Sequence, residues 1–167
     1  MLTIITYPDP ILREEMPEFD FENPIQDPKE LEKSMIEVML ANRGIGLSAN
    51  QVGIRTRMFV MGHSDNAMGI FNPVVVEAEN IVQDEEGCLS FPGIYTKVKR
   101  PTKIKAMWQD SNGEGQQAEI TGMTCKCFLH ELDHLDGIVF QDRVSTLKWA
   151  LATKKANKKG NINVRTR

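Results

Sequence analysis

The chain has 167 residues, a length typical of one domain, and 41% of them are hydrophobic, which is enough for one sizeable core. No apolar run approaches the roughly 20 residues that a membrane-spanning helix needs, and the first residues lack the regions of a signal peptide. Three cysteines, an odd and small number, argue against a disulfide framework. We therefore expect one domain over residues 1–167, in the cytoplasm or in an organelle stroma or matrix.

Charge is unevenly distributed along the chain. Residues 143–167 hold 8 of the 20 lysines and arginines and none of the 23 acidic residues, although the net charge is −3. A basic end on an acidic body favours an anionic partner such as RNA or a membrane surface. It also suits a solvated C-terminal helix, because the helix dipole favours positive charge at its end. We adopt this plainer interpretation and expect neither a membrane nor a DNA partner.

The first helix signal begins at Asp27. Asp27 can cap a helix, Pro28 suits the first helical position, and Glu30 stands where a capping-box acid belongs. Gly44 can stop the helix. Apolar residues recur at helical spacing in between, at Leu31, Met35, Val38 and Met39.

The middle of the chain is predicted to be extended. Residues 57–61 and 73–77 are rich in apolar and β-branched side chains, as strands prefer. Residues 94–108 partly alternate, with one parity formed by Val98, Ile104, Ala106 and Trp108. Asn112-Gly113 predicts a hairpin turn before a strand over residues 117–121.

Helical spacing returns after Gly122. It predicts a helix through Leu135 that Gly137 ends, and a last helix over residues 145–158. The modest apolar face of the last helix consists of Leu147, Ala150 and Leu151. A helix, a run of strands and then helices predict an α+β fold.

A metal-binding pattern lies within the helix predicted over residues 122–135. His130-Glu131-Leu132-Asp133-His134 has the H-E-x-x-H form. Positions i and i+4 lie one turn apart on the same face of a helix, so both imidazoles can reach one ion. Glu131, beside the first histidine, can reach a water at that ion as a general base. The pattern therefore predicts a metal-dependent hydrolase.

The third protein ligand has to be found elsewhere in the chain. Glu131 and His134 are the last glutamate and the last histidine, so the ligand is expected upstream. Cys88 is the best candidate, because it follows an extended run and a thiolate binds zinc and ferrous iron well. The alternative for Cys88 alone is a small buried hydrophobe.

The other candidate ligands fit less well. Cys125 and Cys127 lie two apart, so on a helix they point in different directions. We expect Cys125 to pack in the core and Cys127, which shares a face with His130, to line the pocket wall. His63 stands in a polar loop and is expected at the surface.

A glycine-rich loop follows the first predicted helix, over residues 44–51. It lacks the G-K-[ST] of a phosphate loop. Its small residues would let the backbone approach a substrate, and Gln51 offers an amide donor that can stabilise an oxyanion. Considered alone, the loop is better explained as a turn with a solvated glutamine.

Together these three segments resemble peptide deformylase. That family is marked by a G-x-G loop ending in Gln, then Glu-Gly-Cys-Leu-Ser, then His-Glu-x-Asp-His. All three stand here in that order, over residues 44–51, 86–90 and 130–134. The opening run Tyr7-Pro8-Asp9-Pro10-Ile11-Leu12-Arg13 also looks like the family's start. The resemblance covers residues 1 to about 145 and implies mixed or antiparallel strands packed around a central metal-binding helix, with a C-terminal helix.

The resemblance also implies the roles of individual residues. Cys88, His130 and His134 would bind the metal, and Glu131 would shuttle the proton. Gln51 and the Leu89 backbone N–H would hold the oxyanion. The substrate-binding residues would be Ile45, Gly46, Glu86, Gly87 and Cys127.

Substrate, metal and partners follow from the same resemblance. The substrate would be the N-formyl group of a nascent polypeptide's initiator methionine, released as formate. The family implies one divalent ion, Fe²⁺ in the cell, with Zn²⁺ or Ni²⁺ able to occupy the isolated protein. Some members use a basic C-terminal helix at the ribosome, and residues 143–167 are a candidate for such a contact.

Two alternatives remain open at this point. One is an H-E-x-x-H metallopeptidase that cuts internal peptide bonds. The other is a non-catalytic protein, with a basic tail that binds RNA or with a structural ion. Such an ion would be four-coordinate, through Cys88, Cys127, His130 and His134.

Overall fold

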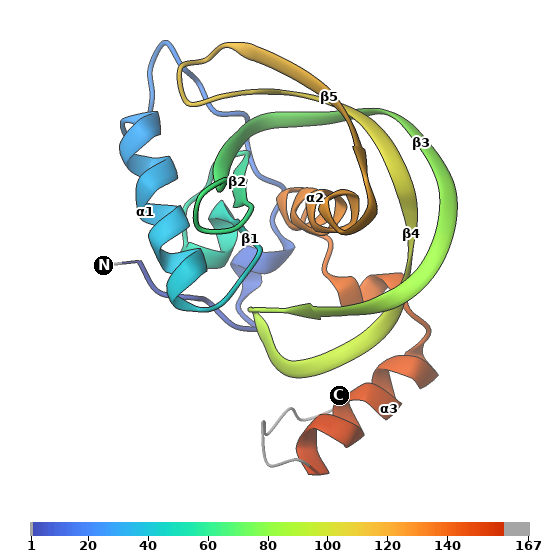
Figure 1. The fold of residues 1–167 in the computed structure, drawn as a ribbon. Helices are drawn as coiled ribbons and strands as arrows, with labels where there is room; N and C mark the ends of the chain where they lie inside the picture. Colours follow the sequence, from blue (N-terminus) through green and yellow to red (C-terminus); the bar gives the residue numbers. More distant parts are fainter. Residues whose placement is uncertain (1, 159–167) are drawn as a thin grey trace.

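Three α-helices and five strands make up the part of the chain that the structure, a computed structural model, describes, residues 2–158 (Figure 1). No helix within these residues is both long and apolar enough to cross a membrane. Short 3-10 helices cover Pro10–Arg13, Ala49–Val52 and Phe140–Arg143. In chain order the main elements are α1 (Pro28–Ala41), β1 (Gly46–Ser48), β2 (Met58–Met61), β3 (Met68–Cys88), β4 (Phe91–Gln109), β5 (Gly115–Thr121), α2 (Gly122–Leu135) and α3 (Thr146–Lys158).

The five strands form one antiparallel sheet in the order β1-β2-β3-β4-β5. The long strands β3 and β4 curve around α2, which is seen nearly end-on at the centre of Figure 1. Asn112 and Gly113 lie in the turn between β4 and β5, and Gly113 has a φ of 79°, which glycine adopts without steric cost. The predicted hairpin is therefore confirmed, and so is an α+β fold with strands around a central helix.

β3 is much longer than the strand predicted over residues 73–77. Its residues 76–85 are all exposed, so neither side of this stretch is buried against the core. They are held instead by pairing with β4, from Ala78 opposite Ile104 to Glu85 opposite Lys97. Backbone hydrogen bonds therefore define this half of β3, and side-chain burial contributes little to it.

α1 begins as predicted and ends differently. The side chain of Asp27 accepts hydrogen bonds from the N–H groups of Lys29 and Glu30, and Pro28 is the first helical residue. The left-handed residue after the helix is Arg43, with a φ of 56°, and the predicted stop, Gly44, is one residue later. Gly44 instead allows close packing, since a Cβ there would lie 2.9 Å from Cδ1 of Leu89. This places the glycine loop against the turn after β3.

α2 lies inside the curved sheet and is buried along most of its length. Cys125, Phe128 and Leu135 belong to an apolar cluster with side chains of β2 and β4. Phe128 meets Phe59 edge to face, with ring centroids 5.1 Å apart. Gly137, with a φ of 68°, follows the helix, as predicted. The apolar side of α2 thus fixes its rotation and turns the opposite side toward the candidate site.

α3 forms where it was predicted, but the predicted buried face is wrong. Leu147, Ala150 and Leu151 are exposed. The buried residues are Trp149, Thr153 and Ala156, and the Trp149 ring packs 5.6 Å from that of Phe91 and 5.5 Å from that of Phe140. The larger apolar area of the tryptophan decides which face turns inward. Residues 159–167, the rest of the basic tail, lie outside the described residues.

Candidate metal centre

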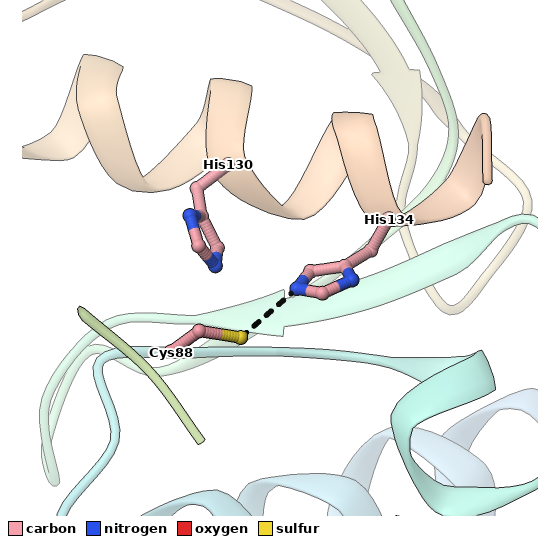
Figure 2. Close-up of side chains that lie close together, drawn as sticks. All are labelled: Cys88, His130 and His134. Carbon is pink, nitrogen blue, oxygen red and sulfur yellow. Dashed lines mark hydrogen bonds between the residues drawn. The ribbon is translucent and has the colours of Figure 1, made fainter. Parts of the chain in front are cut away.

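α2 presents the two histidines of the H-E-x-x-H pattern on one face. His130 and His134 are both buried, and their ring centroids lie 5.0 Å apart. Figure 2 shows both rings projecting from the helix toward the sulfur of Cys88. Helical spacing alone accounts for this pairing, because residues four apart lie one above the other.

Cys88 ends β3 and reaches the histidines from the opposite side. Its Sγ lies 3.2 Å from Nε2 of His134. One ligand atom from each of Cys88, His130 and His134 can be chosen so that all three lie within 4.8 Å of one another, close enough to hold one ion. One sulfur and two imidazole nitrogens form a donor set that suits zinc or ferrous iron. The residues present therefore fit a divalent ion.

The protonation of the two imidazoles differs. Burial lowers the pKa of His134 well below its usual value, and the positive charge of His130 acts in the same direction. Burial also opposes a charge on His130, but the Cys88 sulfur and the Glu86 carboxylate outweigh it and raise the pKa of His130 well above its usual value.

Glu131 lies beside the histidines with its carboxylate enclosed. Only 4% of the residue is exposed, and burial raises the pKa of its carboxyl group. The Ser48 hydroxyl donates to Oε2 of Glu131 over 2.6 Å. A Cβ on Gly46 would lie 2.5 Å from Oε1 of Glu131, so glycine is needed there to make room for the carboxylate. The loop after α1 is therefore shaped around the proposed proton acceptor.

Both the oxygen and the nitrogen of the Gln51 side-chain amide have hydrogen-bond partners. Its Oε1 accepts a hydrogen bond from the Ser48 N–H over 2.9 Å, and its Nε2 lies 3.0 Å from Oγ of Ser90. The same Nε2 is 3.6 Å from Sγ of Cys88. The amide nitrogen therefore faces the sulfur, and its orientation is set by the carbonyl end. Gln51 itself is buried in the short 3-10 helix after β1.

A chain of buried charges stands behind His130. Nδ1 of His130 lies 3.0 Å from Oε2 of Glu86, and Nε of Arg100 donates to Oε1 of Glu86 over 2.8 Å. Arg100 also pairs with Asp133, which in turn pairs with Arg143. Burial alone would raise the pKa of Glu86, but the hydrogen bonds from His130 and Arg100 bring it to about 2. The carboxylate is thus an anion that orients the imidazole.

Sequence reasoning missed Arg100 and Asp133. A signal for Arg100 existed, because it falls on the same parity as Val98 and Ile104, the inward side of β4. Its side chain is only 5% exposed. Asp133 stands within the H-E-x-x-H pattern, where nothing in the local sequence marks it as an ion-pair partner of a strand 33 residues away.

A cavity of about 620 Å³ opens beside these side chains. Its wall includes every residue predicted to act on or bind the substrate. These are Ile45, Gly46, Gln51, Glu86, Gly87, Leu89, Cys127 and Glu131. Cys88 and His130 also line it. Glu86 differs from the others, because its carboxylate is held by Arg100 and His130.

The remaining candidate ligands lie apart from this group. Sγ of Cys127 donates to the carbonyl of Ile45 over 3.3 Å, and Cys127 is not among the three grouped donors. This arrangement gives no support to a four-ligand structural site. Cys125 is fully buried in the apolar cluster around α2, and His63 is exposed in its loop.

Comparisons with known proteins agree with one another. The family profile described as polypeptide deformylase matches residues 1–150. A peptide deformylase of Thermotoga maritima is 38% identical, over 93% of this chain and 94% of that protein. The chloroplastic peptide deformylase 1B of Oryza sativa is 39% identical, over 86% of this chain and 55% of that protein. The crystal structure of a Legionella pneumophila peptide deformylase superposes with a TM-score of 0.87 at 31% identity, over 96% of this chain and 95% of that one.

The matched region contains α1, the whole sheet and α2, and so it contains every residue that surrounds the cavity. Homology over almost the full length of the Thermotoga protein extends beyond the three short motifs. The chain therefore belongs to the polypeptide deformylase family, the metal-dependent hydrolases that remove the formyl group from nascent polypeptides.

Proposed function

We propose that residues 1–167 form one catalytic domain that removes the N-formyl group of an initiator methionine, with one divalent ion held by Cys88, His130 and His134. The observation that supports this assignment most strongly is the convergence of three donor atoms, within 4.8 Å of one another, beside the buried carboxylate of Glu131. The products would be formate and a free amine.

The donor set bears on the identity of the metal. A divalent ion held here would acidify a water ligand and draw electrons from the formyl oxygen. One thiolate and two imidazoles suit ferrous iron and zinc alike. We propose Fe²⁺ in the cell, with Zn²⁺ or Ni²⁺ able to occupy the isolated protein. Air would then inactivate the iron form, because the metal or Cys88 is oxidised.

Glu131 is proposed to move the proton. Its carboxylate accepts a proton from the attacking water and returns it to the departing amine. Two features support this role. Burial raises the pKa of Glu131, the direction that favours a group that has to release a proton as well as accept one. The Ser48 hydroxyl holds one carboxylate oxygen, which leaves the other beside Gly46.

Gln51 and Leu89 are proposed to stabilise the oxyanion that forms when water attacks the formyl carbon. The Gln51 Nε2 group is directed toward Cys88, and Leu89 follows Cys88 at the turn between β3 and β4. Donors that are already oriented need no rearrangement as the charge develops. The hydrogen bond from the Ser48 N–H to the Gln51 carbonyl provides that orientation.

The substrate backbone is proposed to pair with Ile45 and Gly46. β1 is the first strand in the sheet order and pairs only with β2 among the described strands. An extended peptide can add to such an edge through main-chain hydrogen bonds. Glu86, Gly87 and Cys127 would complete the binding site from the opposite walls of the cavity.

Formate release from formyl-Met-Ala-Ser, with metal analysis of the same anaerobically purified sample, tests the function. We expect formate and a ferrous ion in the active sample. Metal-loaded protein that releases no formate would contradict the proposal. A sample that contained only zinc and was fully active would contradict the proposal that the metal is iron, but not the proposed reaction. Cleavage of a long unformylated peptide would favour the metallopeptidase alternative.

The ribosome is proposed as a partner of the basic C-terminal region. Lys148, Lys154, Lys155 and Lys158 are exposed on α3 together with Leu147 and Leu151. Binding to ribosomal RNA through these lysines would weaken as salt increases. Cosedimentation with ribosomes at rising salt tests it, and no cosedimentation even at low salt would refute it. A cytoplasmic or stromal location is consistent with bacterial and chloroplastic relatives.

A further inference from the structure

The cavity extends from the candidate metal centre along the first turns of α2. His130 and Glu131 line it at the metal centre, and Met123, Lys126 and Cys127 line it from earlier positions on α2. One helical turn rises about 5.4 Å, so Lys126 lies about one turn before His130 on the same face. If the formyl group lies beside Glu131, as proposed, the side chain next to it lies within reach of this stretch of wall.

Lys126 is a charged residue on this wall, because its side chain ends in an ammonium group. Its side chain is only 13% exposed, and its ammonium pairs with Asp84 on β3. The Asp84 side chain is 54% exposed and stands outside the cavity wall. Lys126 therefore lines the cavity, whereas the carboxylate that holds its ammonium does not. Lysine often buries its stem in this way.

The carboxylate of Asp84 is itself held in place. Its Oδ1 accepts the backbone N–H of Glu85 over 2.8 Å, which leaves Oδ2 for Lys126. The lysine stem has four rotatable bonds and three donors at its end. The direction in which the flexible ammonium points thus depends on its ion pair with the Asp84 carboxylate.

We propose that Asp84 anchors the ammonium of Lys126 outside the cavity and thereby sets the selectivity of the enzyme for an apolar first side chain. The inference rests on the proposed function, because it concerns the side chain next to the formyl group. Without the anchor, the ammonium turns inward and donates to any acceptor on the substrate side chain. The cavity then accepts a polar analogue of methionine more readily.

Two peptides of matched size measure this selectivity. Formyl-Met-Ala-Ser and its methionine sulfoxide analogue differ by one oxygen, which accepts hydrogen bonds. The quantity to measure is the ratio of their kcat/KM values in the metal-loaded enzyme. The variants are Asp84→Ala, Lys126→Met and the double variant. The exposed Asp84 position tolerates substitution, and Met keeps most of the lysine stem without its charge.

Glu119→Ala is the matched control. Glu119 pairs with Lys103 over 2.9 Å across the β4–β5 pair, and neither residue lines the cavity. Like Asp84, it is an exposed acid whose partner is a lysine. Its loss should leave the ratio unchanged.

We expect Asp84→Ala to lower the preference for methionine over its sulfoxide by about tenfold, the value of a charge-assisted hydrogen bond near solvent. In the Lys126→Met background the same change should have no effect. An unchanged or increased preference in Asp84→Ala would overturn the proposal, and so would an equal decrease in the Lys126→Met background. Wild-type formate release tests the function separately, because only the ratio depends on the anchor.

Discussion

α2 and the β3–β4 pair face each other across the candidate site and contribute to it differently. α2 supplies His130, Glu131 and His134 from a single helical segment, and an apolar cluster behind the helix fixes its rotation. The strands supply Cys88, together with the Glu86–Arg100 ion pair that orients His130. The proposed proton acceptor and two of the metal ligands thus come from local spacing on α2. The third ligand and the ion pair that orients His130 come from pairing distant parts of the chain.

Substitutions on α2 and substitutions on the β3–β4 pair should also have different effects. Replacing a reactive group on α2 removes chemistry and leaves the packing in place. Replacing a buried charge on the strands removes one of the countercharges of its buried partners, which costs folding free energy as well as function. Variants on the two sides test this difference.

The largest effect is expected for Glu131→Gln. The change removes the proton acceptor and keeps the shape, so kcat should fall by about 10²–10⁴. The metal content should stay the same, because Glu131 is not one of the three grouped donors. Formate release and metal analysis of one sample measure both quantities. Near-normal turnover in the metal-loaded variant would refute the role of Glu131.

Arg100→Met tests the strand side. The change leaves Glu86 and Asp133 buried without their shared partner, so the free energy of unfolding should fall by about 3–5 kcal/mol. Metal affinity should fall by about 10- to 100-fold as His130 loses its orientation. Denaturant unfolding and metal titration measure these effects.

Lys103→Met is the control for Arg100→Met. Lys103 lies on the same strand, but its ion pairs with Glu79 and Glu119 are more exposed. Exposed pairs contribute about 0–1 kcal/mol, so this variant should remain near wild type. Equal losses in the two variants would show that burial of the Arg100 network is irrelevant.

Gln51→Ala should lower kcat by about 10²–10³, the usual cost of one oxyanion donor. Its KM for formyl-Met-Ala-Ser should change much less, because the donor acts mainly as charge develops. Steady-state kinetics separate the two parameters. An increase in KM alone would assign Gln51 to substrate binding and remove it from the oxyanion site.

The smallest effect is expected on α3. Leu151 is 59% exposed, so Leu151→Ser should change the free energy of unfolding by less than about 0.5 kcal/mol. Trp149→Ala, on the buried face, should cost about 3–5 kcal/mol. Thermal or denaturant unfolding compares them. If Leu151→Ser lowered the free energy of unfolding as much as Trp149→Ala, the apolar face predicted from sequence would be the buried one after all.

Local signals in the sequence predicted much of the helical part of the fold. Asp27 and Pro28 mark the start of α1, and Gly137 follows the end of α2, as expected. α3 shows the limit of such signals. Its spacing allows two faces, and only the docking of Trp149 on Phe91 and Phe140 selects one.

The strand side of the site was harder to predict, for a physical reason. The exposed half of β3 buries neither of its sides, and the ladder with β4 holds it. The partners of Arg100 are 14 and 33 residues away in the chain, a separation that no local pattern encodes. Cys88 was predicted because the histidine pattern lacked a ligand downstream and because the Glu-Gly-Cys-Leu-Ser segment resembles that of the family.

X-ray absorption spectroscopy of the zinc-loaded protein tests most directly whether Cys88 meets both imidazoles around one ion. We predict one sulfur ligand at about 2.3 Å and two protein nitrogen ligands at about 2.0–2.1 Å, with the sulfur absent from Cys88→Ala. A wild-type spectrum without sulfur, or one unchanged in Cys88→Ala, would contradict a metal centre shared between β3 and α2.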